Sequence, residues 1–246
     1  MTARECLQIL RKIKDVEFAT ADENGMPHNR IIDVMLVEDE KLYFCTARGK
    51  EFYRQLMGTE YTEITGMNRE YQMVRLAGKV QKLADQKKWI DRIFEENPSM
   101  NEVYPGESRY ILEPFCIECG QIEFFDLGKN PIFRETFTIG PAVEEEKGFE
   151  ITNDCIGCGK CKSDCPQQCI SEGTPFVIRQ EHCLHCGLCL RTVRSRRSEC
   201  GVKGNDQRDV DAAFISGRAS ASSGDRVRGK AGGAGTADMS SSVRTA

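Results

Sequence analysis

Four cysteines in a short run constrain this 246-residue chain more than any other feature. Cys155, Cys158 and Cys161 follow one another at three-residue intervals, and Cys165 comes four residues later with Pro166 behind it. Each iron of a [4Fe–4S] cluster takes one thiolate, so a chain that loops round the cluster must present its cysteines on tight turns. Glycines between the cysteines leave room for the backbone to approach the inorganic sulfides. The spacing therefore predicts an iron–sulfur centre.

The first three positions of this run recur 28 residues later as Cys183, Cys186 and Cys189. Two such halves resemble the bacterial two-cluster ferredoxin pattern, in which the fourth cysteine of each run ligates the other cluster. Cys165 should therefore complete a ligand set with the three later cysteines. A zinc site is the alternative, because paired C-x2-C motifs also bind Zn²⁺. Zinc would leave three of the seven cysteines unexplained.

The second half of the repeat is incomplete. The position equivalent to Cys165 is Val193, which has no donor atom for iron, and Arg194 stands where proline is expected. The first three cysteines of the run thus lack a fourth ligand, and we expect one intact cluster beside a second, labile site. Two explanations are open: a reading-frame shift in the gene near Leu190, or a natural variant in which Cys200 or a water fills the site.

Most of the remaining cysteines are interpreted as structural. Cys6 and Cys45 are single thiols in apolar patterns typical of a core. Cys116 and Cys119 form a C-x-x-C on a strand-like segment, whereas a redox pair normally opens a helix, so structural thiols are favoured over that alternative. Cys169 is expected to pack under a cluster rather than bind it.

Composition indicates the cellular compartment of the chain and the classes of partner to expect. Thirteen cysteines would suggest disulfides in a secreted protein, but seven lie in the two motifs and no signal peptide precedes them. No run approaches the roughly 18 apolar residues of a membrane span. We therefore expect a cytoplasmic protein without a membrane partner. Residues 1–190 carry a net charge of −9 and the remainder +5, and an acidic body argues against nucleic acid as the partner.

Hydrophobic periodicity divides the chain into parts. Strands are predicted over 16–20, 30–37, 41–46, 59–65, 71–83, 109–117 and 121–127, and helices over 5–14, 50–57 and 86–96. This pattern predicts a mainly β fold with α+β character, an antiparallel barrel over residues 1–127. Residues 128–147, with two prolines and an acidic run, are expected to be a linker, residues 148–193 a small ferredoxin-like iron–sulfur domain, and residues 201–246 a disordered tail.

Four groups of residues in the barrel occur in a recognisable order. They are Phe18–Thr20 with Gly25–Arg30, Leu42–Thr46, Gly49–Leu56 and Val74–Val80. In order and spacing they resemble the pyridoxamine 5′-phosphate oxidase-like family of FMN-binding split β-barrels, over about residues 7–127. The resemblance implies a homodimer with FMN in a cleft between the subunits, its phosphate held by basic side chains and hydroxyls.

Arg30, Thr46 and Lys50 are the residues that we assign to the FMN phosphate. A flavin phosphate carries about two negative charges, so it favours fixed cations and hydroxyl donors. Lys50 also opens a helix, whose dipole favours an anion. The alternative is that Arg30 and Lys50 are ordinary surface charges. Arg75 is either structural or phosphate-facing, and His28 is a turn residue.

These observations predict a flavin and iron–sulfur redox protein that passes electrons between FMN and [4Fe–4S] clusters. A flavin takes electrons as a pair or singly, whereas each cluster passes one. We expect an FMN-dependent oxidoreductase of unknown substrate, whose partner is a redox protein or a small-molecule electron donor or acceptor. The alternative is an electron-transfer or cofactor-binding module with no substrate turnover of its own.

Overall fold

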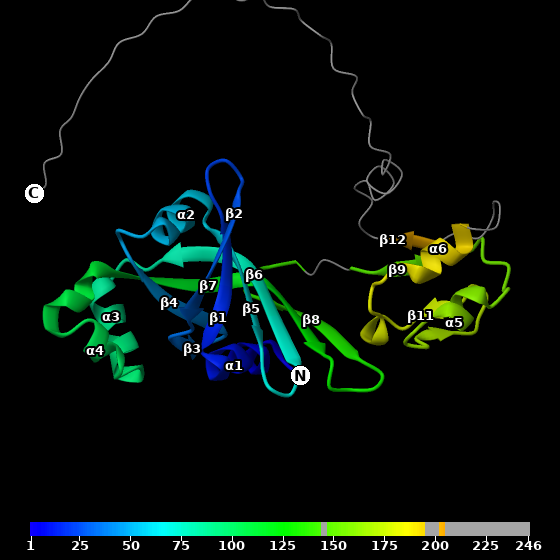
Figure 1. The fold of residues 1–246 in the computed structure, drawn as a ribbon, viewed down its shortest axis with the longest axis horizontal. Helices are drawn as coiled ribbons and strands as arrows, with labels where there is room; N and C mark the ends of the chain where they lie inside the picture. The colour runs from blue at the N-terminus through cyan, green and yellow to red at the C-terminus, as the bar shows by residue number, and fades with distance from the viewer. Residues whose placement is uncertain (144–146, 195–201, 205–246) are drawn as a thin grey trace, which may run out of the picture. The chain divides into compact units, whose positions relative to one another are not determined.

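One antiparallel sheet of eight strands organises the N-terminal part of the protein (Figure 1). The computed structural model describes residues 1–143, 147–194 and 202–204. The strand order is β2-β1-β5-β6-β7-β4-β3, and β8 pairs with β7 outside this path. The strands are β1 (Asp15–Ala21), β2 (Pro27–Asp33), β3 (Leu36–Glu38), β4 (Lys41–Ala47), β5 (Tyr61–Met67), β6 (Gln72–Lys82), β7 (Leu112–Asp126) and β8 (Phe133–Ile139). The predicted fold class, a mainly β antiparallel split barrel, is confirmed.

Helices cover and connect the strands. They are α1 (Ala3–Ile13), α2 (Glu51–Thr59), α3 (Gln86–Glu96), α4 (Met100–Val103) and the 3-10 helix η1 (Gly106–Ile111). Thr2 caps α1 by accepting a hydrogen bond from the Glu5 backbone N–H. None of the helices in the described ranges is both long enough and apolar enough to cross a membrane.

The main core lies between α1, α2 and the sheet. Phe18 and Phe44 pack with ring centroids 4.8 Å apart, and Phe44 stacks on Phe115 at 5.5 Å. Leu7 and Leu10 of α1 are fully buried against the same cluster. Burying one such side chain contributes about 1.5–3 kcal/mol. This alternation of buried side chains is the pattern from which the barrel was predicted.

A single long strand, β7, replaces two of the predicted strands. Segments 109–117 and 121–127 were expected to form a pair, but residues 112–126 are continuous. The first part of β7 pairs with β4 and the second part with β8. Gly120 lies opposite Gly78 of β6, and a Cβ on Gly120 would meet the Ala77 carbonyl oxygen at 2.5 Å. Glycine is therefore required here because the two backbones approach closely. In the sequence alone, such a glycine indicates a boundary between two strands.

The linker interpretation of residues 128–147 was wrong for its central part. Residues 133–139 form β8, which pairs with β7 from Gly120 to Asp126. The alternation of Phe133, Phe137 and Ile139 with polar residues is a strand pattern, but prolines and an acidic run flank it. The barrel sheet consequently extends beyond residue 127.

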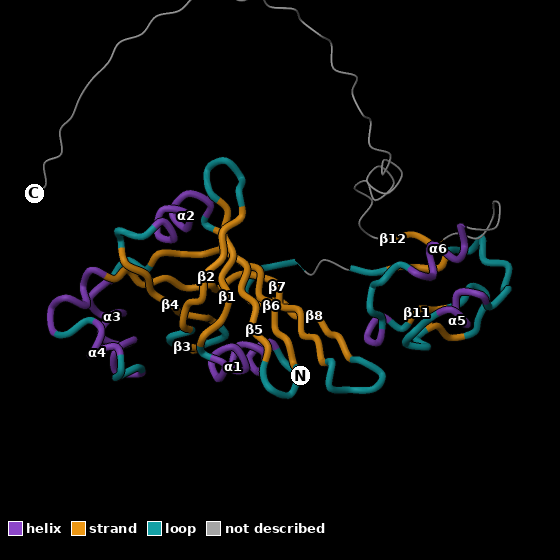
Figure 2. The backbone as a smooth tube through the Cα atoms, in the orientation of Figure 1, coloured by secondary structure: helices purple, strands orange, loops and turns teal. Residues whose placement is uncertain are grey.

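The cysteine-rich part has a small hydrophobic core of its own, and Figure 2 shows its short helices and strands. Its elements are β9 (Phe149–Ile151), α5 (Lys160–Asp164), β10 (Ile170–Ser171), β11 (Val177–Ile178), the 3-10 helix η2 (Gln180–His182), α6 (Leu188–Arg194) and β12 (Val202–Gly204). In each of the two predicted halves a helix begins one residue before the third cysteine, and α5 packs against α6. Residues 202–204, expected to belong to a disordered tail, pair with β9. The rest of that tail lies outside the described residues.

Candidate iron–sulfur and flavin sites

One cavity in the cysteine-rich part is lined by the four cysteines predicted to hold the intact cluster. These are Cys165, Cys183, Cys186 and Cys189. The rest of the lining is largely apolar, including Phe149, Ile170, Ile178, Leu184 and Leu188. Cys165 comes from the first run and the others from the second, so the structure brings together the combination that sequence analysis expects. Their role as ligands stays a prediction.

The backbone of the second loop is shaped for close approach to sulfur. Gly187 has a φ of 69° and His185 a φ of 53°. The His185 backbone N–H donates to Cys183 Sγ, with the two atoms 3.4 Å apart. Such N–H···S hydrogen bonds are one means by which a protein tunes the potential of a cluster. Burial raises the pKa of the Cys189 thiol to about 11, so binding iron must offset the cost of forming a buried thiolate.

Cys169 is a fifth thiol that lines this cavity. It is 2% exposed, and its Sγ lies 3.5 Å from Cys165 Sγ. Burial, followed by hydrogen bonding to Cys165, raises the pKa of Cys169. This placement agrees with a side chain packed beneath the predicted cluster.

The first loop offers three thiols. Cys161 is buried in the small core, Cys155 is half-buried and Cys158 is exposed. Val193, the position that would supply the fourth ligand, lies in α6. Cys200, the proposed substitute, falls outside the described residues.

Zinc coordination has no counterpart in the part of the chain that the structure describes. A structural zinc ion needs four donors arranged tetrahedrally about one point. Within the described ranges, no three His, Cys, Asp or Glu side chains converge in this way. The cysteines of a four-iron cluster must likewise surround one compact group, so the preference for iron over zinc rests on the cysteine spacing, of which zinc would leave three of the seven unexplained.

The three residues assigned to FMN surround α2. Arg30, on β2, donates to Thr20 Oγ1 at 2.5 Å and to Gln55 Oε1 at 2.8 Å, and its guanidinium lies 4.6 Å from the Phe52 ring centroid. Burial lowers the pKa of Arg30. Arg30 is therefore engaged with side chains of β1 and α2 and is not an unpaired surface charge.

Thr46 and Lys50 do not have the side-chain hydrogen bonds to the protein that Arg30 makes. Thr46 is 2% exposed, and its Oγ1 is buried with no hydrogen-bond partner. Lys50 is the exposed N-cap residue of α2, and its side chain makes no capping hydrogen bond. A buried hydroxyl without a partner is costly, so the residues present fit a group that brings a hydrogen-bonding oxygen to Thr46.

Sequence analysis missed a set of charges beside Thr46. Glu113 is the cross-strand partner of Thr46 on β7, and its side chain is 5% exposed. Arg48 Nη1 lies 3.0 Å and Lys82 Nζ 3.3 Å from its carboxylate oxygens. Two cations meet one carboxylate, which leaves excess positive charge near the unsatisfied hydroxyl. Sheet register brings these residues together, so only the family resemblance could have pointed to this region.

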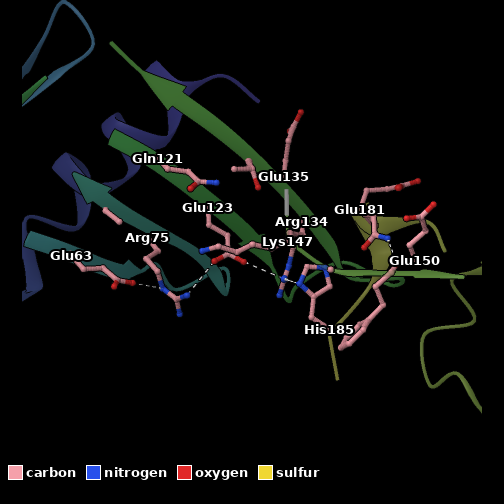
Figure 3. Close-up of a pocket in the computed structure, with 15 residues that line it drawn as sticks. Glu63, Arg75, Gln121, Glu123, Arg134, Glu135, Lys147, Glu150, Glu181 and His185 are labelled. Carbon is pink, nitrogen blue, oxygen red and sulfur yellow. Dashed lines mark hydrogen bonds and ion pairs between the residues drawn. The ribbon is translucent and has the colours of Figure 1, made fainter. Parts of the chain in front are cut away.

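A polar cavity lies over the outer face of β6, β7 and β8 (Figure 3). Arg75 contacts Glu63 at 3.0 Å and Glu123 at 3.2 Å. Glu123 in turn lies 3.3 Å from Arg134, whose guanidinium donates to His185 Nδ1. Arg75 is thus held by carboxylates, which favours the structural role over a phosphate-facing one.

Of the remaining cysteines of the barrel, Cys6, Cys45 and Cys116 are buried thiols, and Cys119 is half-buried. Burial raises the pKa of Cys6 and of Cys45 to about 12, and that of Cys116 to about 11. Cys116 packs with Leu36 and Tyr43. A thiol with so high a pKa carries little thiolate, which agrees with the structural interpretation.

Comparisons with known proteins find matches to a family model and to two ferredoxins. Residues 2–103 match the model of the pyridoxamine 5′-phosphate oxidase family. Ferredoxin Fdx2 of Sorangium cellulosum (strain So ce56) is 51% identical over 37 residues, and a ferredoxin of Butyribacterium methylotrophicum is 44% identical over 35 residues. These matches cover 15% and 14% of this chain and span 37% and 64% of the two ferredoxins.

Solved structures similar to the chain are distant in sequence. A NimC/NimA family protein from Clostridium acetobutylicum is 21% identical, with a TM-score of 0.47 over 56% of this chain and 93% of that one. A pyridoxamine 5′-phosphate oxidase-related, FMN-binding protein from Nostoc punctiforme PCC 73102 is 15% identical, with a TM-score of 0.39 over the same shares.

Proposed function

We propose, from an N-terminal part that matches the pyridoxamine 5′-phosphate oxidase family, that this chain is a redox protein that passes electrons between FMN and [4Fe–4S] clusters. The carrying observation is the cavity lined by Cys165, Cys183, Cys186 and Cys189. Four thiols from two separate runs meet there, as a cluster with one thiolate per iron requires. The two short ferredoxin matches support the same assignment.

The flavin half of the proposal rests on the surroundings of α2. The unsatisfied Thr46 hydroxyl, the excess positive charge of Arg48 and Lys82, and the exposed Lys50 at the helix N-cap suit a phosphate. Arg30 contributes from β2 by fixing Gln55 and Phe52 of the same helix. FMN would supply the exchange between two-electron and one-electron chemistry.

An ultraviolet–visible spectrum with quantified iron, sulfide and flavin tests the cofactor content of the anaerobically purified chain. We expect one FMN and about four tightly held irons per chain, because one ligand set is complete. A colourless protein that contains zinc would overturn the proposal. Consumption of NAD(P)H or of a small oxidant by the purified protein separates an oxidoreductase from a module without its own turnover.

Lys50→Ala tests the flavin site directly. Loss of one charge-assisted contact costs roughly 1.5–3 kcal/mol, so FMN affinity should fall about ten- to a hundredfold. Lys79→Ala, which removes another exposed lysine of the barrel, is the matched control and should bind FMN as the unmodified chain does. Equal FMN affinity in Lys50→Ala and the control would place the phosphate elsewhere.

A homodimer is proposed from the family resemblance, since its flavin cleft lies between subunits. A shortened chain ending at Gly140 suits the test, because β8 belongs to the sheet and should be retained. Light scattering should give a dimeric mass for this chain. A monomer with full flavin occupancy would contradict the proposal.

A further inference from the structure

Ile132, the residue directly before strand β8, contacts both segments that carry ligands of the proposed intact cluster. The Ile132 backbone N–H donates to Gln167 Oε1 at 3.3 Å, two residues after Cys165. Its carbonyl oxygen accepts from His182 Nδ1 at 2.8 Å, directly before Cys183. A barrel-sheet element is thus in contact with two of the loops that line the cysteine cavity.

Arg134 of β8 makes a third contact, with the loop between Cys183 and Cys186. Its guanidinium donates to His185 Nδ1 (Figure 3). A guanidinium has no acceptor atom, so the histidine nitrogen must accept this hydrogen bond. His185 is also the residue whose backbone N–H donates to Cys183 Sγ. Arg134 therefore holds the residue that donates to a proposed ligand sulfur.

The positive charge of Arg134 is only partly compensated. Its side chain is 17% exposed and lies 3.3 Å from one oxygen of Glu123, while the other oxygen of that carboxylate pairs with Arg75. The Arg134 guanidinium lies 4.9 Å from the Phe125 ring centroid, and its Nε is buried without a hydrogen-bond partner. Solvent screens charges in such a setting less than it screens exposed ones.

We propose that Arg134 is a positioning residue that raises the reduction potential of the cluster held by Cys165, Cys183, Cys186 and Cys189. Reduction adds one negative charge to the cluster, and a fixed cation nearby favours the reduced form. Holding His185 also preserves the N–H···S hydrogen bond, which acts in the same direction. This inference rests on the proposed function, because it needs the cluster to be present.

A redox titration of the full-length, cluster-loaded chain at one fixed pH tests the proposal. Arg134→Gln should shift the midpoint potential of the tightly held cluster to more negative values. Glu123→Gln should shift it to more positive values, because it removes the negative charge that compensates Arg134. Arg92→Gln, which breaks an ion pair with Glu96 on α3, is the matched control and should leave the potential unchanged.

The opposite signs separate an electrostatic role from simple loosening of the loop. A shift of both variants in the same direction, or no shift in Arg134→Gln, would overturn the proposal. If Arg134→Gln fails to retain the cluster, Arg134→Lys keeps the charge and should give a potential close to that of the unmodified chain. The direction of the shift in midpoint potential is then tested by Glu123→Gln, which should still make the potential more positive. Absence of iron from the unmodified chain would instead refute the proposed function.

Discussion

Replacing Thr46 by valine removes a buried hydroxyl that has no hydrogen-bond partner in the protein. Valine has nearly the same shape, and it suits a strand position. An unsatisfied buried polar group costs about 1–3 kcal/mol. Thr46→Val should therefore stabilise the flavin-free protein by about 1 kcal/mol, which raises Tm by roughly 2–4 °C in a chain of this size.

The same substitution should weaken FMN binding. If Thr46 donates to the phosphate, its loss removes a hydrogen bond to a charged group, worth about 1.5–3 kcal/mol. FMN affinity should then fall about ten- to a hundredfold. Stability and affinity thus change in opposite directions, an outcome that a general packing defect would not produce.

Thr62→Val is the matched control for both measurements. Thr62 is equally buried, but its hydroxyl donates to the Ala19 carbonyl oxygen at 2.8 Å. Its loss should destabilise the flavin-free protein by about 0.5–1.5 kcal/mol. Thermal unfolding of the flavin-free protein and fluorescence titration with FMN provide the two readouts. A flavin-free Thr46→Val protein that melts below the unmodified chain would refute the reasoning.

Three further tests, two that use pairs of substitutions and one that uses alkylation, probe the rest of the molecule. Cys165→Ser should abolish the tightly held iron, about four atoms per chain, whereas Cys161→Ser should leave it bound. If an iron assay instead finds the iron lost in Cys161→Ser and kept in Cys165→Ser, the tightly held cluster belongs to the other ligand set. Cys45, with a pKa raised by burial to about 12, should resist alkylation at pH 8 in the folded protein, because the thiolate fraction there is about 10⁻⁴; peptide mapping that finds it labelled without unfolding would contradict this. Gly120→Ala should destabilise the barrel by at least about 1–3 kcal/mol, since the new Cβ would meet a backbone carbonyl oxygen at 2.5 Å, whereas Gly49→Ala meets nothing within 4 Å and serves as the control in chemical denaturation.

Structural features that depend on residues close together in the sequence were predictable. The cysteine loops depend on spacing within a few residues, and α1 and most strands depend on local periodicity. Strand β8 was missed because its alternation is short and lies between prolines and an acidic run.

Features that depend on pairing between distant segments were not predictable. Arg30 meets Gln55 across 25 residues, and Arg48 meets Glu113 across 65. Only the register of β4 with β7 places Glu113 beside Thr46. The candidate residues of the flavin site were therefore identified by type, while their partners emerged from the fold.

In the cysteine-rich part, the residues that would bind iron and the strand that pairs with β9 come from different segments of the chain. All seven predicted ligands precede Leu190, yet the strand that covers β9 comes from residues 202–204. A protease cut or a premature stop after Arg194 would thus preserve every predicted ligand while leaving the backbone N–H and C=O groups along one side of β9 unpaired. An exposed strand edge of this kind is a template for association with other chains, so such a fragment would be prone to aggregate even while it still binds iron.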